Sequence, residues 1–160
     1  MRPTVDAVKL IGCLVVTLGT GFVGSLSTRS GIDTWYASLS KPVFTPPGWI
    51  FAPAWTALYV MMGIAAYLVL RQGLRQPGVA AALVAFAAQL GLNLLWSMLF
   101  FGKRQPLWGL ADIAALWVMI VVTMVLFFRV SKPAGWLFVP YLAWVSFASV
   151  LNYEIWRLNR

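Results

Sequence analysis

The sequence predicts an all-α integral membrane protein, a bundle of five transmembrane helices with a long loop between the first and the second. Of its 160 residues, 61% are hydrophobic and only 10% are charged, whereas soluble domains carry about 25% charged residues. Five segments each have the length of about 20 mostly apolar residues that a helix needs to cross a bilayer. No linker or low-complexity tract divides the chain, so residues 1–160 form one predicted domain.

The predicted spans are separated by short intervals, except for a longer one after the first. They are residues 7–26, 49–70, 79–101, 107–128 and 134–156. The first, with Arg2 and Lys9 ahead of it, also has the pattern of a secretory signal peptide, but we expect it to remain as a membrane helix. Short connections with Gly, Pro and basic residues follow spans two, three and four, so neighbouring helices should be antiparallel. The long loop, residues 27–48, is stiffened by prolines and is expected to pack on the bundle.

The charged and reactive residues exclude several functions. The twelve Lys and Arg residues give a net charge of +8, but they are scattered between apolar segments, which is typical of membrane flanks and not of nucleic-acid binding. Six fall on each predicted face, so they indicate no orientation. With one cysteine and no histidine, the chain lacks an internal disulfide and the common ligands of zinc and haem. We expect no metal and no cofactor.

Polar and aromatic side chains gather in the half of the bilayer beneath the long loop, because helix direction alternates. They are Trp55, Asn93, Trp96, Trp108, Asp112, Asn152 and Tyr153. Helical spacing places Gln89, Asn93 and Trp96 on one face of span three, and Trp108 with Asp112 on one face of span four. We predict that these faces converge on a pocket with the loop as its lid, suited to flat, largely apolar ligands.

Some of these residues allow two interpretations. Asp112 lies inside the hydrocarbon region, so it is either a ligand or proton site or an internal pair with an indole N–H, Asn93 or a basic loop residue. Trp35, Trp49, Trp136 and Trp156 fall at the predicted interfaces and are interpreted as anchors, whereas Trp55, Trp96 and Trp144 lie deeper and are assigned to the pocket.

Two weaker patterns concern partners. Span three contains small residues four apart, Ala81 with Ala85 and Ala87 with Gly91, which favour close helix packing either within the bundle or in a homodimer through this helix. Near the C-terminus, Leu151, Tyr153 and Arg157 fit a proposed sterol-contact pattern.

Several motifs in one order resemble the translocator protein family, also called TspO or the peripheral-type benzodiazepine receptor family. They are WYASLSKP at 35–42, PPGW at 46–49, PAWTALY at 53–59, QLGLNLLW at 89–96, FFG at 100–102 and PYLAWVSFASVLNY at 140–153. The resemblance covers nearly the whole chain and implies a bacterial member in the cell envelope.

The resemblance also implies a receptor that binds porphyrins or haem and isoquinoline carboxamides. Sterols or lipids are further ligands that it implies. The ligand-contacting positions it implies are Tyr36, Pro47, Trp55, Asn93, Trp96, Asp112, Trp144 and Ala148. Its sterol motif falls on Leu151, Tyr153 and Arg157.

Three functions are compatible with the sequence. The first is tetrapyrrole binding for transport or for regulation of tetrapyrrole biosynthesis. The second is a light-dependent enzyme that degrades porphyrin, for which Trp55 and Trp144 are the candidate catalytic residues. The third is a small proton-coupled transporter that uses Asp112.

Overall fold

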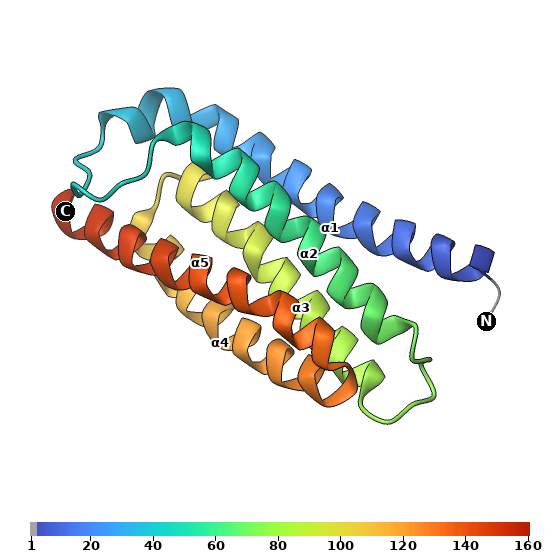
Figure 1. Cartoon of the computed structure of the whole chain (residues 1–160). Coiled ribbons are helices and arrows are strands. Elements are labelled where there is room, and N and C mark those ends of the chain that lie inside the picture. Colours follow the sequence, from blue (N-terminus) through green and yellow to red (C-terminus); the bar gives the residue numbers. More distant parts are fainter. Residues whose placement is uncertain (1–2) are drawn as a thin grey trace.

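Five long helices make up most of the computed structural model, which describes residues 3–160 (Figure 1). They are α1 (Pro3–Gly31), α2 (Phe51–Leu70), α3 (Val79–Ser97), α4 (Pro106–Val130) and α5 (Lys132–Leu158). Three short elements adjoin them: η1 (Ile32–Tyr36), η2 (Gly48–Ile50) and η3 (Met98–Gly102). All five helical regions are long and apolar enough to cross a membrane, which confirms the predicted five-helix membrane fold.

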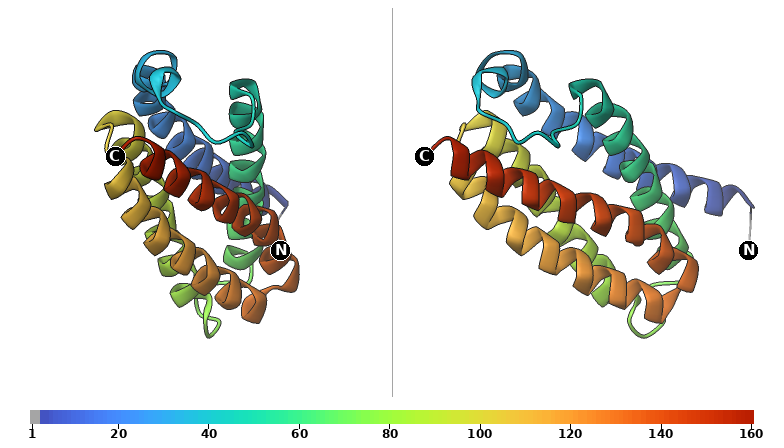
Figure 2. Two further views of the ribbon diagram at one scale, coloured as in Figure 1. Left: turned by 90° about the vertical axis from the view of Figure 1, so that its left-hand side faces the viewer. Right: turned by 60° about the vertical axis from the view of Figure 1, so that its left-hand side comes forward.

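The helices form a closed ring in the order α1, α2, α5, α4, α3. Helix α4 packs extensively against both α3 and α5, while α2 joins α1 to α5 and α1 contacts α3 to close the ring. Successive helices run in opposite directions, so the two termini lie at opposite ends of the bundle (Figures 1 and 2). The connection between α1 and α2 lies at the same end as the C-terminus, as the sequence predicts.

The two ends of the bundle are filled differently. Toward the N-terminus of α1, a continuous core of buried side chains joins α2, α3, α4 and α5. Its largest fully buried members include Tyr141, Phe127, Phe138, Met62 and Leu116. A separate, smaller cluster of Tyr36, Phe100, Leu151 and Ile155 lies at the end with the long loop. The space between these two clusters is where the cavity described below lies.

Close contact between α1 and α2 depends on a glycine. A Cβ atom built on Gly63 would lie 2.8 Å from both Leu14 Cδ2 and Thr17 Oγ1, and 3.2 Å from the backbone Cα of Leu14. Small residues at such crossings allow the backbones of membrane helices to approach each other. Gly63 therefore sets the distance between these two helices.

The first helix is longer than predicted, and the loop after it is correspondingly shorter. Helical structure continues past residue 26 through Gly31, the π-helical turn Ile32–Tyr36 and residues 37–38. Polar residues such as Thr28 and Ser38 are accommodated because their hydroxyls donate to the carbonyls of Gly24 and Trp35. Lys41 then donates from Nζ to the carbonyls of Tyr36, Ala37 and Leu39 at 2.8–3.2 Å, which satisfies the end of the helical segment.

The small residues of α3 do not all lie on one face. Ala85 is buried within the bundle, whereas Ala81, Ala87 and Gly91 are exposed, and a Cβ atom on Gly91 would meet nothing within 4 Å. Ala81 and Ala85 therefore do not form a common outer surface. The pair Ala87 and Gly91 does, and a homodimer through α3 stays a prediction.

Candidate functional site

A cavity of about 490 Å³ lies at the loop end of the bundle. Its walls come from α1, η1, the start of α2, the end of α3 with η3, and the end of α5. The lining residues are Leu18, Gly21, Phe22, Gly24, Ser25, Thr28, Arg29, Ile32, Tyr36, Gly48, Phe51, Ala52, Trp55, Thr56, Tyr59, Asn93, Trp96, Ser97, Phe100, Phe101, Trp144, Phe147, Ala148, Leu151, Asn152 and Ile155. Its volume falls within the range of about 300–1,000 Å³ that is usual for small-molecule pockets.

Aromatic rings form much of the cavity wall and pack against one another. On one side, the rings of Trp96 and Phe100 are stacked, with centroids 5.2 Å apart and an interplanar angle of 18°. On the other, Trp144 meets Trp55 edge to face at 6.5 Å and Phe51 edge to face at 6.0 Å. Rings held by such contacts lose little further freedom when a ligand binds, so they provide a rigid apolar surface.

The polar side chains of the cavity wall include three from α1. The hydroxyls of Ser25 and Thr28 donate to carbonyls of their own helix, which leaves their lone pairs as acceptors. Arg29, in the last turn of α1, is the one charged side chain among the described lining residues, and it forms no ion pair with a described residue. The Trp144 indole Nε1 is fully buried and has no hydrogen-bond partner in the described part of the chain.

A buried hydrogen-bond network lies beneath the cavity and joins three helices. The Tyr59 hydroxyl of α2 donates to Asn93 Oδ1 of α3, and Asn93 Nδ2 donates to the Tyr141 hydroxyl of α5 at 2.9 Å. Tyr141 in turn donates to Gln89 Oε1 at 2.9 Å. The network satisfies polar groups that water does not reach, and it fixes the orientation of Asn93.

A second amide ties α3, α4 and α5 together at the cavity wall. Trp96 Nε1 donates to Asn152 Oδ1 at 3.0 Å, and Asn152 Nδ2 donates to the carbonyl of Pro106 at 2.9 Å. Both amide ends of Asn152 are thus used, and the Trp96 ring is held in one position.

The segment after η1 is held close to the cavity by Tyr36 and Lys41. Tyr36 lines the cavity, and the centroid of its ring lies 5.6 Å from that of Phe101. The Lys41 ammonium lies 5.0 Å from the centroid of the Tyr36 ring. Burial raises the pKa of the Tyr36 hydroxyl above its ordinary value of 10.0, so this side chain is neutral at physiological pH.

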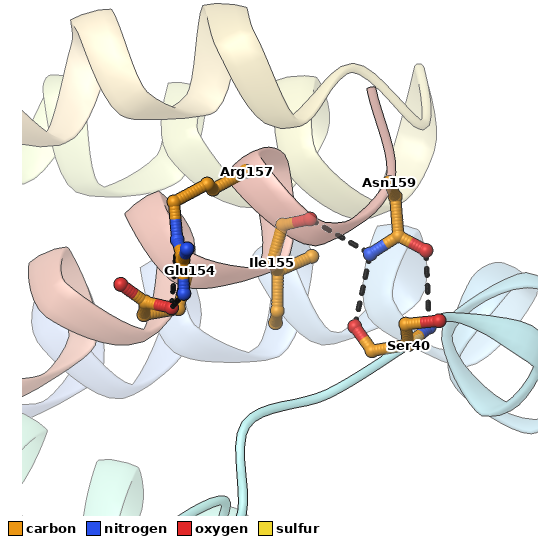
Figure 3. Close-up of polar contacts among 5 residues, drawn as sticks. All are labelled: Ser40, Glu154, Ile155, Arg157 and Asn159. Atoms are coloured by element: carbon orange, nitrogen blue, oxygen red, sulfur yellow. Dashed lines mark hydrogen bonds and ion pairs between the residues drawn. The ribbon is translucent and has the colours of Figure 1, made fainter.

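A latch joins the long loop to the C-terminal end of α5 (Figure 3). The backbone N–H of Ser40 donates to Asn159 Oδ1 at 3.0 Å, and Asn159 Nδ2 donates back to the carbonyl of Ser40 at 2.9 Å. The same Nδ2 also donates to the carbonyl of Ile155 at 2.7 Å, which orients the amide from its own helix. One side chain therefore holds the loop near the cavity by two hydrogen bonds.

We expect Asn159→Ala to loosen this loop. The loss of two hydrogen bonds, each worth about 0.5–1.5 kcal/mol, raises the population of open loop conformations by about fivefold or more. Hydrogen–deuterium exchange measures this directly at the Ser40 amide. Arg157→Gln is the matched control, because Arg157 pairs with Glu154 at 2.6 Å and does not contact the loop (Figure 3). Equal exchange in both variants would contradict the role of the latch.

The model of the TspO/MBR family matches residues 13–157. The chain belongs to the TspO/MBR family. The resemblance inferred from the motifs is thereby confirmed.

Individual relatives agree with this assignment over nearly their full lengths. The tryptophan-rich protein TspO of Chlorobaculum tepidum is 51% identical over 147 residues, which are 92% of this chain and 93% of that protein. A protein of the same name from Archaeoglobus fulgidus is 46% identical over 154 residues, 96% of this chain and 99% of that protein. The translocator protein of Bos taurus is 43% identical over 149 residues, 92% and 87% of the two chains.

In this TspO/MBR family member, most of the predicted ligand-contacting residues lie around one cavity. Tyr36, Trp55, Asn93, Trp96, Trp144 and Ala148 all line it. Pro47 is not among the lining residues, although the adjacent Gly48 is. The structure therefore brings six of the eight predicted residues together, and their contact with a ligand stays a prediction.

The predicted convergence of the α4 face on the cavity is wrong. No described α4 residue lines the cavity, because α4 packs between α3 and α5 on the far side of the ring. The buried stripe of α4 begins at Gly109, which Phe100 and Asn152 approach, and the adjacent Trp108 is turned outward and is 63% exposed. Asp112 is buried, and its Oδ2 has none of the expected partners among the described residues.

The three residues of the sterol pattern do not share a face. Leu151 is buried and lines the cavity, whereas Tyr153 is 44% exposed and packs against Trp156. Arg157 is exposed and bonds to Glu154. Positions 153 and 157 are one helical turn apart and point away from position 151, so a sterol that contacted all three would have to reach around α5.

Sequence reasoning missed the contribution of α1 and of several tyrosines and phenylalanines. Tyr59 and Tyr141 form the network with Asn93, and Phe51 and Phe147 complete the wall near Trp144. The only available signal was periodicity, since Trp55 and Tyr59 are one turn apart, as are Trp144 and Ala148. The latch residue Asn159 had no signal in the sequence pattern.

Proposed function

We propose that this protein is a membrane receptor or transporter that binds tetrapyrroles in the cavity between α1, α2, α3 and α5. The observation that carries the proposal is an aromatic-walled cavity with a cation at its loop end, Arg29, which forms no ion pair with a described residue. A tetrapyrrole such as protoporphyrin has a flat, apolar ring system with two carboxylates at one edge. The two chemistries are complementary, since the rings stack on indoles and a carboxylate pairs with a guanidinium.

The residues suggest how each part of the ligand is held. Trp55 and Trp144 offer indole surfaces to the macrocycle. Arg29 lies in the last turn of α1, after the uncharged residues 10–28, so the carboxylates stay at the interface while the ring enters the apolar cavity. The chain has no histidine to ligate haem iron, so free porphyrin is expected to bind about as well as haem.

A porphyrin titration in detergent tests the proposal. Protoporphyrin is expected to quench tryptophan fluorescence in a saturable way, and Trp55→Leu combined with Trp144→Leu should weaken binding at least tenfold. Trp136→Leu is the matched control, because Trp136 is 66% exposed at the start of α5, far from the cavity. Equal affinity in the wild type, the double variant and the control would contradict binding in this cavity.

A second set of titrations tests whether Arg29 binds the carboxylates of the porphyrin. Arg29→Gln should weaken binding of the dicarboxylate porphyrin by about tenfold, since a charge-assisted hydrogen bond is worth about 1.5–3 kcal/mol. The dimethyl ester of the same porphyrin lacks the charge and should bind the wild type and Arg29→Gln alike. An equal loss of affinity for both ligands would show that Arg29 does not bind the carboxylate.

A further inference from the structure

A second hollow lies near the opposite end of the bundle, between α1, α2 and α3. It is a groove of about 410 Å³, here called the outer groove. Its floor includes Ala66 and Phe86, which are buried, and its rim includes Gly12 and Val16, which are exposed. Lys9 lies at one end of it. The groove is thus apolar along its length and carries a cation at the outer end.

The groove exists because α1 leaves the bundle at its N-terminal end. This part of α1 extends beyond the other helices (Figure 2). Gly12 has no side chain to fill the space, and a Cβ atom there would meet nothing within 4 Å. An apolar groove of this kind in the hydrocarbon region is filled by an apolar chain that lies beside the protein, such as the acyl chain of a lipid.

Charges at this end favour an anion. Lys9 is half-buried and makes no ion pair with any described residue, including Asp6 one turn earlier on the same helix. The neighbouring helix ends and turns add basic residues, which are Arg71, Arg75, Arg129 and Lys132. The field at the mouth of the groove is therefore positive.

The depth of Lys9 suits a lipid headgroup. Residues 10–28 carry no charged side chain and have about the length that crosses the hydrocarbon, so Lys9 lies at one end of this apolar stretch. This depth is near the boundary between headgroups and hydrocarbon. Val16 lies about 10 Å deeper, so the groove runs along the direction of an acyl chain. We propose that the outer groove binds one acyl chain of an anionic phospholipid, whose phosphate pairs with Lys9.

A second copy of this chain is a poorer occupant. A two-fold symmetric contact through the groove would apply the same patch to itself. It would bring the two Lys9 side chains together at an interface between chains that each carry a net charge of +8. An anionic lipid neutralises this charge, whereas a second copy adds to it.

Native mass spectrometry of the full chain tests the proposal. The protein is equilibrated with equal amounts of phosphatidylglycerol and phosphatidylcholine, and the lipids retained after release from detergent are counted. The wild type should retain one phosphatidylglycerol per chain with about a fivefold preference over phosphatidylcholine, as expected for one lysine at a membrane surface. Lys9→Gln should abolish the preference, and Gly12→Leu should abolish retention by filling the groove.

Two variants serve as matched controls. Arg75→Gln removes a charge from the same end without touching the groove, and Gly19→Leu adds the same side chain to α1 at another open position. Both should behave as the wild type. Equal effects of Lys9→Gln and Arg75→Gln, or equal retention by Gly12→Leu and Gly19→Leu, would overturn the proposal. So would a dimer that Gly12→Leu dissociates without changing the retained lipid.

A measurement on the unmodified chain avoids any failure of a variant to fold. Cys13 lines the outer groove and is the single cysteine of the sequence. Its alkylation by a membrane-permeant maleimide should be slower in vesicles that contain phosphatidylglycerol than in phosphatidylcholine alone. Equal rates in the two kinds of vesicle would contradict occupation of the groove by an anionic lipid.

Discussion

Asn93→Leu is expected to lower the free energy of unfolding by about 1–3 kcal/mol. The substitution keeps the branched shape and the number of heavy atoms of the side chain but removes the acceptor of the Tyr59 hydroxyl and one donor to Tyr141. Tyr141 keeps its bond to Gln89, whereas the Tyr59 hydroxyl is left buried without that partner. An unsatisfied buried hydroxyl costs more than the net value of the hydrogen bond it loses. Thermal unfolding in detergent measures the change.

The double variant Tyr59→Phe with Asn93→Leu separates this cause from a change in packing. It removes the stranded hydroxyl together with its partner, so it should recover part of the stability that Asn93→Leu loses. If the double variant is no more stable than Asn93→Leu alone, the loss does not come from the network. The single variant Tyr59→Phe completes the cycle.

Gly63→Leu is expected to destabilise the protein by about 1–3 kcal/mol, the usual cost of inserting atoms into a packed contact. A side chain at this position meets Thr17 Oγ1 and the backbone of Leu14, and the backbone cannot move aside as a flexible side chain can. Helix α1 must therefore shift away from α2. Because α1 forms one wall of the cavity, ligand affinity should fall together with the melting temperature.

Gly19→Leu is the control for this effect. A Cβ atom on Gly19 would meet nothing within 4 Å, and the residue is exposed on the same helix as Leu14 and Thr17. The melting temperature of Gly19→Leu should stay near that of the wild type. A loss as large as that of Gly63→Leu would mean that added bulk in the helices, and not the α1–α2 contact, causes the destabilisation.

Much of the fold was predictable because the bilayer, and not the neighbouring helices, sets the length and hydrophobicity of each transmembrane helix. Crossing the hydrocarbon demands a long apolar segment whose backbone bonds are internal, so length and hydropathy locate the spans. The end of α1 was the exception. Its continuation to Gly31 and the following turn depends on Lys41 and on contacts of Tyr36 with η3, which local sequence does not reveal.

The candidate site was predictable to the extent that periodicity fixes direction. Asn93 and Trp96 share a face of α3, and both line the cavity as expected. Asp112 and Trp108 also share a face by spacing, but only knowledge of the ring order shows that α4 lies behind α3 and α5. Spacing along a helix shows which of its residues share a face. Packing against the neighbouring helices sets the rotation of the helix about its axis, and so decides which face meets the cavity.

By itself, the sequence determined that the protein spans the membrane five times, that its polar residues gather beneath the long loop, and that the loop motifs are those of the TspO/MBR family. These properties follow from hydrophobicity, spacing and motif order, which are local. The tertiary structure alone decided the order of the helices, the absence of α4 from the described cavity wall, the Tyr59–Asn93–Tyr141 network and the Asn159 latch. Such contacts join residues up to 119 positions apart, and no local pattern specifies which distant partner a side chain meets.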